Sequence, residues 1–434
     1  MAISKNLLLR RAEHLFLVPY FLMLSTAFYF LFSSSLDVTG LTRANESFVY
    51  FTLWIALYFF LLMFFLLDLP SVPRGLWVPQ LLTIATVLTY IVFGVQTSSI
   101  IKFVTLIFTL MFGCWAASRI ETEKFFNYFF NVSIVVAAIH LALFPSLFSL
   151  SLHFDSLQRI NIFGTTAYAG LFAHKNHAGT FFALAMVVGV SRACSEGGRF
   201  TPTITIGLLL QFIGLGLSGA VGPLIAMTVS LMVLLIFTVY ARNAVAGMAL
   251  ALTTMIVLLL FLGFQDVLLN SLNRDATYTG RSYLYEVFWH YFSASPWVGY
   301  GYGEAFNGTS ESVGERVNAA TGTRWAHYIN FESGILQCLI DFGLVGFILY
   351  ALMIWRAGRY AWRSMGSARS KQFGPLALLV YIIVSSVNEV FIVLANTLPL
   401  VFLVFLFAKD APLVRRRTVQ RHIGVVAPPL AQRH

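Results

Sequence analysis

The side chains best suited to phosphate and acid–base chemistry gather in one polar stretch, between about Gln265 and Glu332, of an otherwise apolar chain. Arginine pairs its N–H donors with phosphate oxygens, and a histidine or a carboxylate can take the proton of a hydroxyl group. Candidates of both kinds occur there: Arg274, Asp275, Arg281, Arg316, Arg324, His327 and Glu332. Each alone is more often an ordinary loop residue, but as a set they are suited to binding pyrophosphate and deprotonating a hydroxyl.

A second polar group, His174-Lys175-Asn176, comes directly before an apolar run that starts near residue 178. A lysine beside the first turn of a helix, where backbone N–H groups are free, can hold an anionic head group such as a phosphate. The alternative is that these residues only end an apolar helix in the head-group layer, where long polar side chains reach water. The residues alone favour neither interpretation. Arg159 lies in the same polar segment.

Local signals predict a short helix and a tight turn inside the long polar stretch. Thr279 can cap a helix, and the following Arg281–Phe292 is aromatic and apolar on one broad face. Such a helix is expected to lie at the membrane surface, with Arg281 in its first turn and its end before Pro296. The glycines of 299–303 let the backbone turn tightly and approach a ligand, which makes Tyr300 a candidate substrate contact.

The rest of the chain is apolar enough to cross a membrane many times. Of its 434 residues, 58% are hydrophobic and only 11% are charged. A bilayer core of about 30 Å needs about 20 apolar residues per helix, so runs of this length are predicted to span it. The predicted spans are 15–36, 48–67, 78–95, 98–117, 125–144, 178–193, 203–218, 221–240, 246–264, 335–355, 374–394 and 397–408.

This pattern predicts an all-α polytopic membrane protein, a single domain over 1–434 with about twelve transmembrane helices. One large loop, 265–334, carries the short interfacial helix. Because basic loops mark the cytoplasmic side, both termini and the basic tail 409–434 are placed there, and the large loop faces outside. The net charge of +10 follows from this topology, so no nucleic-acid partner is implied. The three cysteines lack metal-ligand spacing, and neither a metal nor a cofactor is expected.

One ionisable residue is predicted inside a span. Asn388-Glu389 falls near the outer end of the run 374–394. An ionisable group at such a depth is a functional candidate, here for substrate binding. The alternative, that Glu389 pairs with a polar group of a neighbouring helix or reaches the interface, has equal weight.

Four motifs follow one another in a characteristic order. They are His174-Lys175-Asn176, Asp275-Ala-Thr-Tyr-Thr279-Gly280-Arg281, Ser295-Pro-Trp-Val-Gly-Tyr-Gly-Tyr-Gly303, and Gly334-Ile-Leu-Gln337 with Gly343-Leu-Val-Gly346. With these motifs and one large late loop, the chain resembles the O-antigen ligase and Wzy polymerase superfamily. Within it, the chain looks most like the ExoQ-type exopolysaccharide polymerases.

The resemblance implies a metal-independent glycosyltransferase of the bacterial inner membrane with a fold of the GT-C type. Its donor would be an undecaprenyl-pyrophosphate-linked oligosaccharide, used on the periplasmic side. In a polymerase the acceptor is another lipid-linked repeat unit, and in a ligase it is the lipid A core. The flippase and the chain-length regulator of the same pathway would be further partners. A flippase itself is disfavoured, because the polar clusters gather on one face rather than along a path through the membrane.

The family's functional residues carry over unevenly. Arg281 and Lys175 match positions that would bind pyrophosphate. The family commonly has His-Asn eleven residues before the first glycine of the Gly-x-x-Gly turn, but here Glu332 stands at that distance from Gly343. Either Glu332 is the base, with His327 assisting, or His327 itself reaches the site. The end of the seventh span reads Leu217-Ser218-Gly219-Ala220 and lacks the cation that relatives often carry after the serine.

Overall fold

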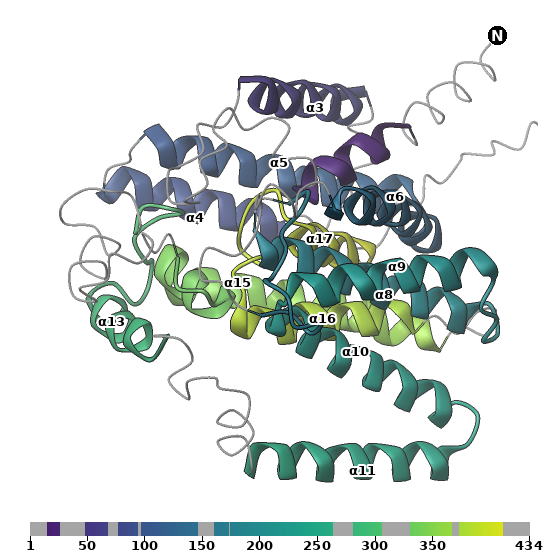
Figure 1. Ribbon diagram of the computed structural model, residues 1–434. Helices are drawn as coiled ribbons and strands as arrows, with labels where there is room; N and C mark the ends of the chain where they lie inside the picture. Colours follow the sequence, from purple (N-terminus) through teal and green to yellow (C-terminus); the bar gives the residue numbers. More distant parts are fainter. Residues whose placement is uncertain are drawn as a thin grey trace, which may run out of the picture.

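The computed structural model describes residues 15–26, 48–67, 77–93, 97–145, 160–172, 174–263, 281–305, 330–366 and 373–410. The helices in these ranges are Leu15–Leu24, α3 (Phe48–Leu67), α4 (Trp77–Phe93), α5 (Thr97–Arg119), α6 (Thr122–Ala142), α8 (Lys175–Ser195), α9 (Pro202–Ser218), α10 (Val221–Tyr240), α11 (Ala244–Gly263), α13 (Arg281–Ala294), α15 (Gly334–Met365), α16 (Gly374–Asn388) and α17 (Leu398–Lys409). Figure 1 shows them as a bundle.

The all-helical membrane fold predicted from the apolar runs is confirmed. Five helices in the described ranges are long and apolar enough to cross a membrane, and seven shorter apolar helices follow the other predicted spans. Local signals fix the ends. At α9, the Thr201 hydroxyl accepts from the Ile204 N–H at 3.4 Å, Pro202 opens the helix, and Gly219 ends it in the left-handed conformation.

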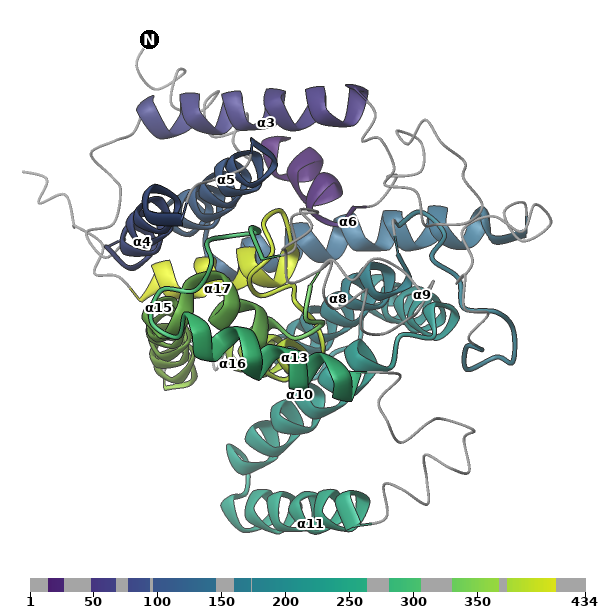
Figure 2. The same cartoon turned by 90° about the vertical axis from the view of Figure 1, so that its left-hand side faces the viewer.

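The centre of the bundle is α17, and its edges are α3 and α11. Every residue of α17 from Leu398 to Ala408 is buried, as expected for a helix that is apolar all round. Phe405 stacks on Phe125 of α6 with 4.1 Å between ring centroids, and α17 packs along α5 and α15. Figures 1 and 2 place α3 and α11 at opposite edges of the molecule.

Helix α15 differs from the predicted span 335–355 in that it runs on to Met365 and is broken at Gly343, where φ is +62°. The turn 295–303 fills the break. The N–H groups of Tyr300 and Gly301 donate to the carbonyls of Ile340 and Asp341 at 2.8 and 2.9 Å. Beyond the break, Leu344 and Val345 donate to the Pro296 and Trp297 carbonyls at 2.8 and 3.1 Å. These four bonds matter because non-helical backbone at membrane depth is tolerated only where its polar groups are paired.

The glycines of the turn allow its backbone to lie close to the backbone of α15. Their approach to a ligand stays a prediction. A β-carbon on Gly299 would lie 2.7 Å from the Gly343 nitrogen, and one on Gly343 would overlap the Trp297 carbonyl. Tyr300 also donates its hydroxyl to the Tyr291 carbonyl at 2.9 Å. Its role in binding substrate stays a prediction.

The short helix predicted after Thr279 is α13, which begins at Arg281 and ends at Ala294, before Pro296. Its Leu284, Phe288 and Tyr291, spaced by four and three residues, are buried in a cluster with Phe331 and Ile340, whereas Trp289 is 63% exposed. Figure 2 shows α13 lying across one end of the bundle, in front of α16. The cap Thr279 lies outside the described residues, and the membrane-surface position of α13 stays a prediction.

Candidate functional site

Five helix ends meet at one end of the bundle. They are the starts of α8, α10 and α15 and the ends of α9 and α16. At the first of these contacts, a β-carbon on Gly179 of α8 would overlap that of Ala220 and lie 3.2 Å from the Ser218 hydroxyl and 3.4 Å from the Pro223 ring. The beginning of α8, at Gly179, therefore lies directly on the short connection between α9 and α10.

The motif His174-Lys175-Asn176 forms the start of α8. His174 is the N-cap, and its Nδ1 accepts from the Asn176 N–H at 3.2 Å. Lys175 is only 4% exposed. Residues four apart share a face of a helix, so Lys175 and Gly179 are both on the side of α8 that faces the α9–α10 connection. The side chain of Lys175 is therefore buried at the start of α8, and its binding of an anionic group stays a prediction.

Glu389 and Asn388 reach the same place from α16. Their predicted position is inside the run 374–394, but α16 ends at Asn388 and Glu389 is extended, with φ −143°. A β-carbon on Gly222, in the first turn of α10, would lie 3.4 Å from Glu389 Oε1 and 3.5 Å from the Asn388 β-carbon. Glu389 is 8% exposed. A carboxylate beside the first turn of a helix is stabilised by the partial positive charge there.

The start of α15 brings Glu332 next to this group. The Gly334 N–H donates to the Glu389 carbonyl at 3.0 Å, and the Ser333 hydroxyl donates to the Ser386 carbonyl at 3.4 Å. Glu332 itself is half-buried and has φ +51°, a conformation that side-chain-bearing residues rarely adopt. Its N–H donates to Asn330 Oδ1 at 2.8 Å. Such strain gathers at functional sites.

Two polar residues that are not among the predicted site residues, Gln337 and Asp341, connect this segment to the turn 295–303. Gln337 Oε1 accepts from the Phe331 N–H, and its Nε2 donates to Asp341 Oδ1, both at 3.0 Å. The same Asp341 oxygen accepts from the Gly303 N–H at 3.3 Å. The sequence pattern that could have indicated them is their spacing of four residues inside an apolar run. Polar groups at such a position need partners on the same helix or on its neighbours.

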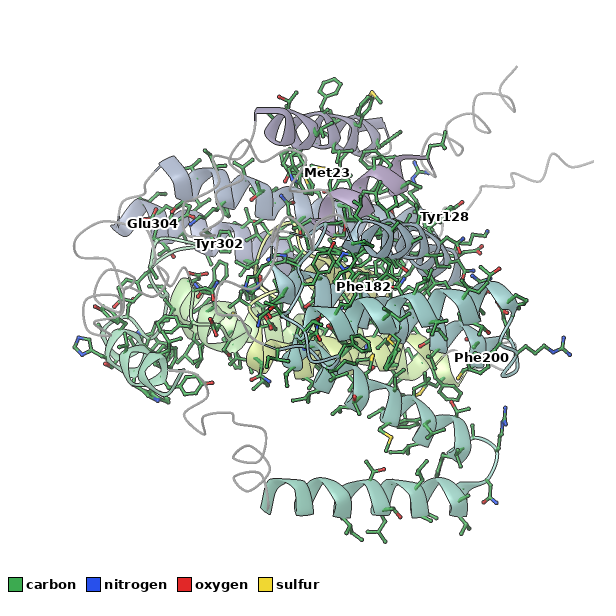
Figure 3. The ribbon with its side chains drawn as sticks, viewed as in Figure 1. Met23, Tyr128, Phe182, Phe200, Tyr302 and Glu304 are labelled. Atoms are coloured by element: carbon green, nitrogen blue, oxygen red, sulfur yellow. The ribbon has the colours of Figure 1, made fainter. Side chains whose placement is uncertain are left out.

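Tyr302 ties the turn to the chain that follows α16. Its hydroxyl accepts from the Ala395 N–H at 2.8 Å, and burial raises the pKa of Tyr302 above its ordinary value. Its carbonyl accepts from the Tyr90 hydroxyl of α4 at 2.6 Å. Figure 3 shows Tyr302 and Glu304 on the side of α4, far from Phe200 at the opposite end of the bundle.

The segment that precedes α8 also packs on the end of α9. Asn161 Nδ2 and the Tyr168 N–H donate to the Leu217 carbonyl at 3.3 and 2.9 Å. His140 of α6, which carried no assigned role, is fully buried, and its Nδ1 accepts from the Leu171 N–H at 3.4 Å. The segment is therefore held by packing and by backbone bonds against the α9 end.

The structure thus brings together Lys175, His174, Asn176, Glu332, Asn388 and Glu389 at one set of helix ends. Six other candidates lie outside the described residues: Arg159, Arg274, Asp275, Arg316, Arg324 and His327. The backbone of Arg281 begins α13, but its side chain is not described. Within the described ranges, no three His, Cys, Asp or Glu side chains are grouped to hold a metal ion.

The fit of α8 on the α9–α10 connection gives a first prediction. Gly179→Ala should lower the melting temperature of the purified protein, because overpacking a tight contact costs about 1–3 kcal/mol. The matched control is Gly358→Ala on α15, where an added β-carbon meets nothing nearer than Leu379 at 3.6 Å. Equal melting temperatures for the two variants would show that α8 does not depend on this contact.

Residues 206–351 match the model of a family described as O-antigen ligase. No curated protein matches the chain. The matched residues contain the α9–α10 connection, α13, the turn 295–303, Glu332 and the break at Gly343. Residues 206–351, about a third of the chain, are therefore similar to the O-antigen ligase family, and this match supports the resemblance to the O-antigen ligase and Wzy polymerase superfamily.

Proposed function

We propose that the protein is a polysaccharide polymerase that joins undecaprenyl-pyrophosphate-linked repeat units on the periplasmic face of the bacterial inner membrane. One observation carries the proposal: the starts of α8, α10 and α15 meet beside the buried Lys175 and the strained Glu332. Three helix starts present partial positive charge, which suits a pyrophosphate leaving group. A carboxylate at the same place suits the deprotonation of an acceptor.

The reaction proposed is a single inverting displacement. An acceptor hydroxyl oxygen attacks the anomeric carbon of the donor sugar, and the bond from that carbon to the pyrophosphate oxygen breaks. Glu332, with His327 assisting, takes the hydroxyl proton. Lys175 and Arg281 hold the pyrophosphate as negative charge develops on it, so their cationic groups can act without a metal. The lipid pyrophosphate is released with the bonding electron pair.

A ligase is the second candidate, because the matching family model is described as O-antigen ligase. A ligase would use the same donor chemistry and differ in its acceptor, the lipid A core. Deletion of the gene separates the functions. Loss of a polymerase leaves single repeat units in place of polymer, and this is the result we expect. Polymer that stays on its lipid carrier would indicate a ligase instead, and lipid-linked repeats that stay in the cytoplasmic leaflet would indicate a flippase.

The role of Lys175 gives a second prediction. Lys175→Gln should weaken donor binding and lower activity by about 10- to 100-fold, because a hydrogen bond to a charged group contributes about 1.5–3 kcal/mol. Lys175→Arg should retain more activity, since it keeps the charge. Lys124→Gln is the matched control, as that lysine is 58% exposed and pairs with Glu121 at the start of α6. An elongation assay with purified protein should find that Lys124→Gln is near wild type; equal losses for the two lysines would remove Lys175 from the site.

A further inference from the structure

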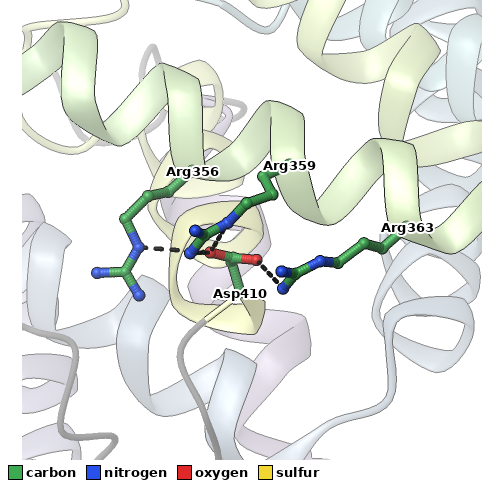
Figure 4. A network of polar contacts seen from close by, with 4 residues as sticks. All are labelled: Arg356, Arg359, Arg363 and Asp410. Atoms are coloured by element: carbon green, nitrogen blue, oxygen red, sulfur yellow. Dashed lines mark hydrogen bonds and ion pairs between the residues drawn. The ribbon is translucent and has the colours of Figure 1, made fainter.

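A cluster of cationic side chains lies on α15 at the opposite end from the candidate site. Arg356, Arg359 and Arg363 all contact the carboxylate of Asp410, which follows α17 (Figure 4). Arg356 Nε is 3.5 Å and Arg363 NH1 is 3.0 Å from the carboxylate, and Arg359 donates to it from Nε at 2.9 Å and from NH2. Three arginines and one carboxylate leave a formal charge of 3 − 1 = +2 in the cluster.

The position of the cluster along α15 matches the second surface of a bilayer. Gly334, which bonds to Glu389 in the candidate site, is separated from Arg356 by 22 positions of α15. At about 1.5 Å per residue this is about 33 Å, close to the thickness of a hydrocarbon core of about 30 Å. If α15 starts in one head-group layer, the three arginines therefore lie in the opposite head-group layer.

Two exposed tryptophans border the cluster on the outer face of α15. Trp355 and Trp362 are 60% and 66% exposed, and they lie four residues before and three residues after Arg359. The guanidinium carbon of Arg359 is 4.9 Å from the centre of the Trp355 ring. Tryptophan is enriched where membrane meets water, because its ring is apolar and its N–H is polar. The two rings therefore indicate that this face of α15 meets lipid at head-group level.

A lipid approaches from the outer surface of the bundle, so the exposure of each arginine side chain decides whether that arginine can reach the lipid. The side chains of Arg359 and Arg363 are 39% and 62% exposed, whereas those of Arg356 and Asp410 are 9% and 0% exposed. Arg356 also lies over the Phe407 ring at 4.6 Å, so it belongs to the interior of the cluster. The accessible part is a pair of guanidinium groups beside two lipid-facing indoles.

We propose that Arg359 and Arg363, flanked by Trp355 and Trp362, bind the phosphodiester of an anionic phospholipid. Guanidinium groups hold phosphate oxygens through paired N–H donors, and the excess positive charge favours an anionic over a zwitterionic lipid. Basic pockets between helices at the head-group layer bind anionic lipids in this way. The indole rings would cover the glycerol and the first acyl carbons. The proposal does not depend on the reaction at the other end of the bundle.

The test is a titration of the purified full-length protein, in a neutral detergent, with dioleoylphosphatidylglycerol and with dioleoylphosphatidylcholine, read by native mass spectrometry. Arg359→Gln/Arg363→Gln should bind phosphatidylglycerol about 25-fold more weakly, at about fivefold per arginine. The matched control is Arg199→Gln/Arg242→Gln, which removes the same charge from two exposed loop arginines on the same predicted side. It should bind within about twofold of wild type. If both double variants lost the same amount of phosphatidylglycerol binding, the effect would come from general surface charge, and the proposed site would be wrong.

Two further arms separate this site from a purely structural ion cluster and from a site for free phosphate. Asp410→Asn raises the charge of the cluster to 3 − 0 = +3 and should strengthen phosphatidylglycerol binding, even if the protein melts at a lower temperature. If the arginines only hold α17 in place, the binding of phosphatidylglycerol should not strengthen, and this result would contradict the proposal.

Inorganic phosphate at the same free concentrations should not displace the lipid. Efficient displacement would show that the ligand is a soluble anion instead. Trp355→Leu/Trp362→Leu keeps the charge of the cluster and should weaken the binding of phosphatidylglycerol. As with the wild-type protein, inorganic phosphate should not displace the lipid from this variant.

Discussion

Glu332→Gln is expected to lower the turnover of lipid-linked repeat units by about 10²- to 10⁴-fold, the range that general bases contribute. The substitution keeps the size of the side chain and removes its ability to take a proton. Because Lys175 and the three helix starts are unchanged, binding of the donor should stay within a few-fold of wild type. The measurement is an elongation assay with purified protein, paired with a separate donor-binding titration.

A second substitution at the same position separates catalysis from folding. Glu332 has φ +51°, a conformation that glycine adopts without strain. Glu332→Gly should therefore keep or raise the melting temperature while it loses activity as fully as Glu332→Gln. Glu196→Gln is the control, because that carboxylate pairs with Arg192 at 2.9 Å at the end of α8 remote from the site. Full activity in both Glu332 variants would exclude this residue as the base and leave His327 as the remaining candidate.

Gly343→Val is expected to prevent the accumulation of folded protein. Gly343 combines φ +62° with a position where a β-carbon would overlap the Trp297 carbonyl, so any side chain meets backbone rather than a movable side chain. Left-handed strain costs about 1–3 kcal/mol for a residue other than glycine, and the overlap adds to it. Expression yield and the monodisperse fraction after purification measure the effect.

The matched control lies on the same helix. Gly358→Ala puts a β-carbon 3.6 Å from Leu379, an ordinary contact, and alanine favours a helix over glycine by about 1 kcal/mol. It should be neutral or stabilising. If the Gly343→Val protein instead could be purified and elongated substrate as well as the Gly358→Ala protein, the packing of the turn 295–303 in the break of α15 would not be needed for the site.

Much of the fold could be predicted from the sequence because the length of an apolar run reports the length of a span. The predicted runs 48–67 and 221–240 coincide with α3 and α10. The helix after Thr279 was also predictable, since apolar residues recurring at helical spacing mark the face that α13 buries through Leu284 and Phe288. Each of these features depends on residues close together in the chain.

The arrangement of the site was not predictable in the same way, because it depends on contacts between distant segments. Gly343 was visible as part of a Gly-x-x-Gly motif, but hydropathy does not distinguish a broken helix from a continuous one. The bond from Gly334 to the Glu389 carbonyl joins segments that no local pattern links. The polar pair Gln337 and Asp341 was present in the sequence, yet its partners Phe331 and Gly303 only appear in three dimensions.

The central claim, glycosyl transfer at the meeting point of five helix ends, is tested most directly with purified full-length protein and one synthetic undecaprenyl-pyrophosphate-linked repeat unit. We predict a ladder of longer lipid-linked glycans, formed in the presence of a metal chelator and accompanied by one released lipid pyrophosphate per repeat joined. A protein that is monodisperse and binds the donor, but forms no ladder and transfers the glycan only when lipid A core is added, would contradict the polymerase and identify a ligase.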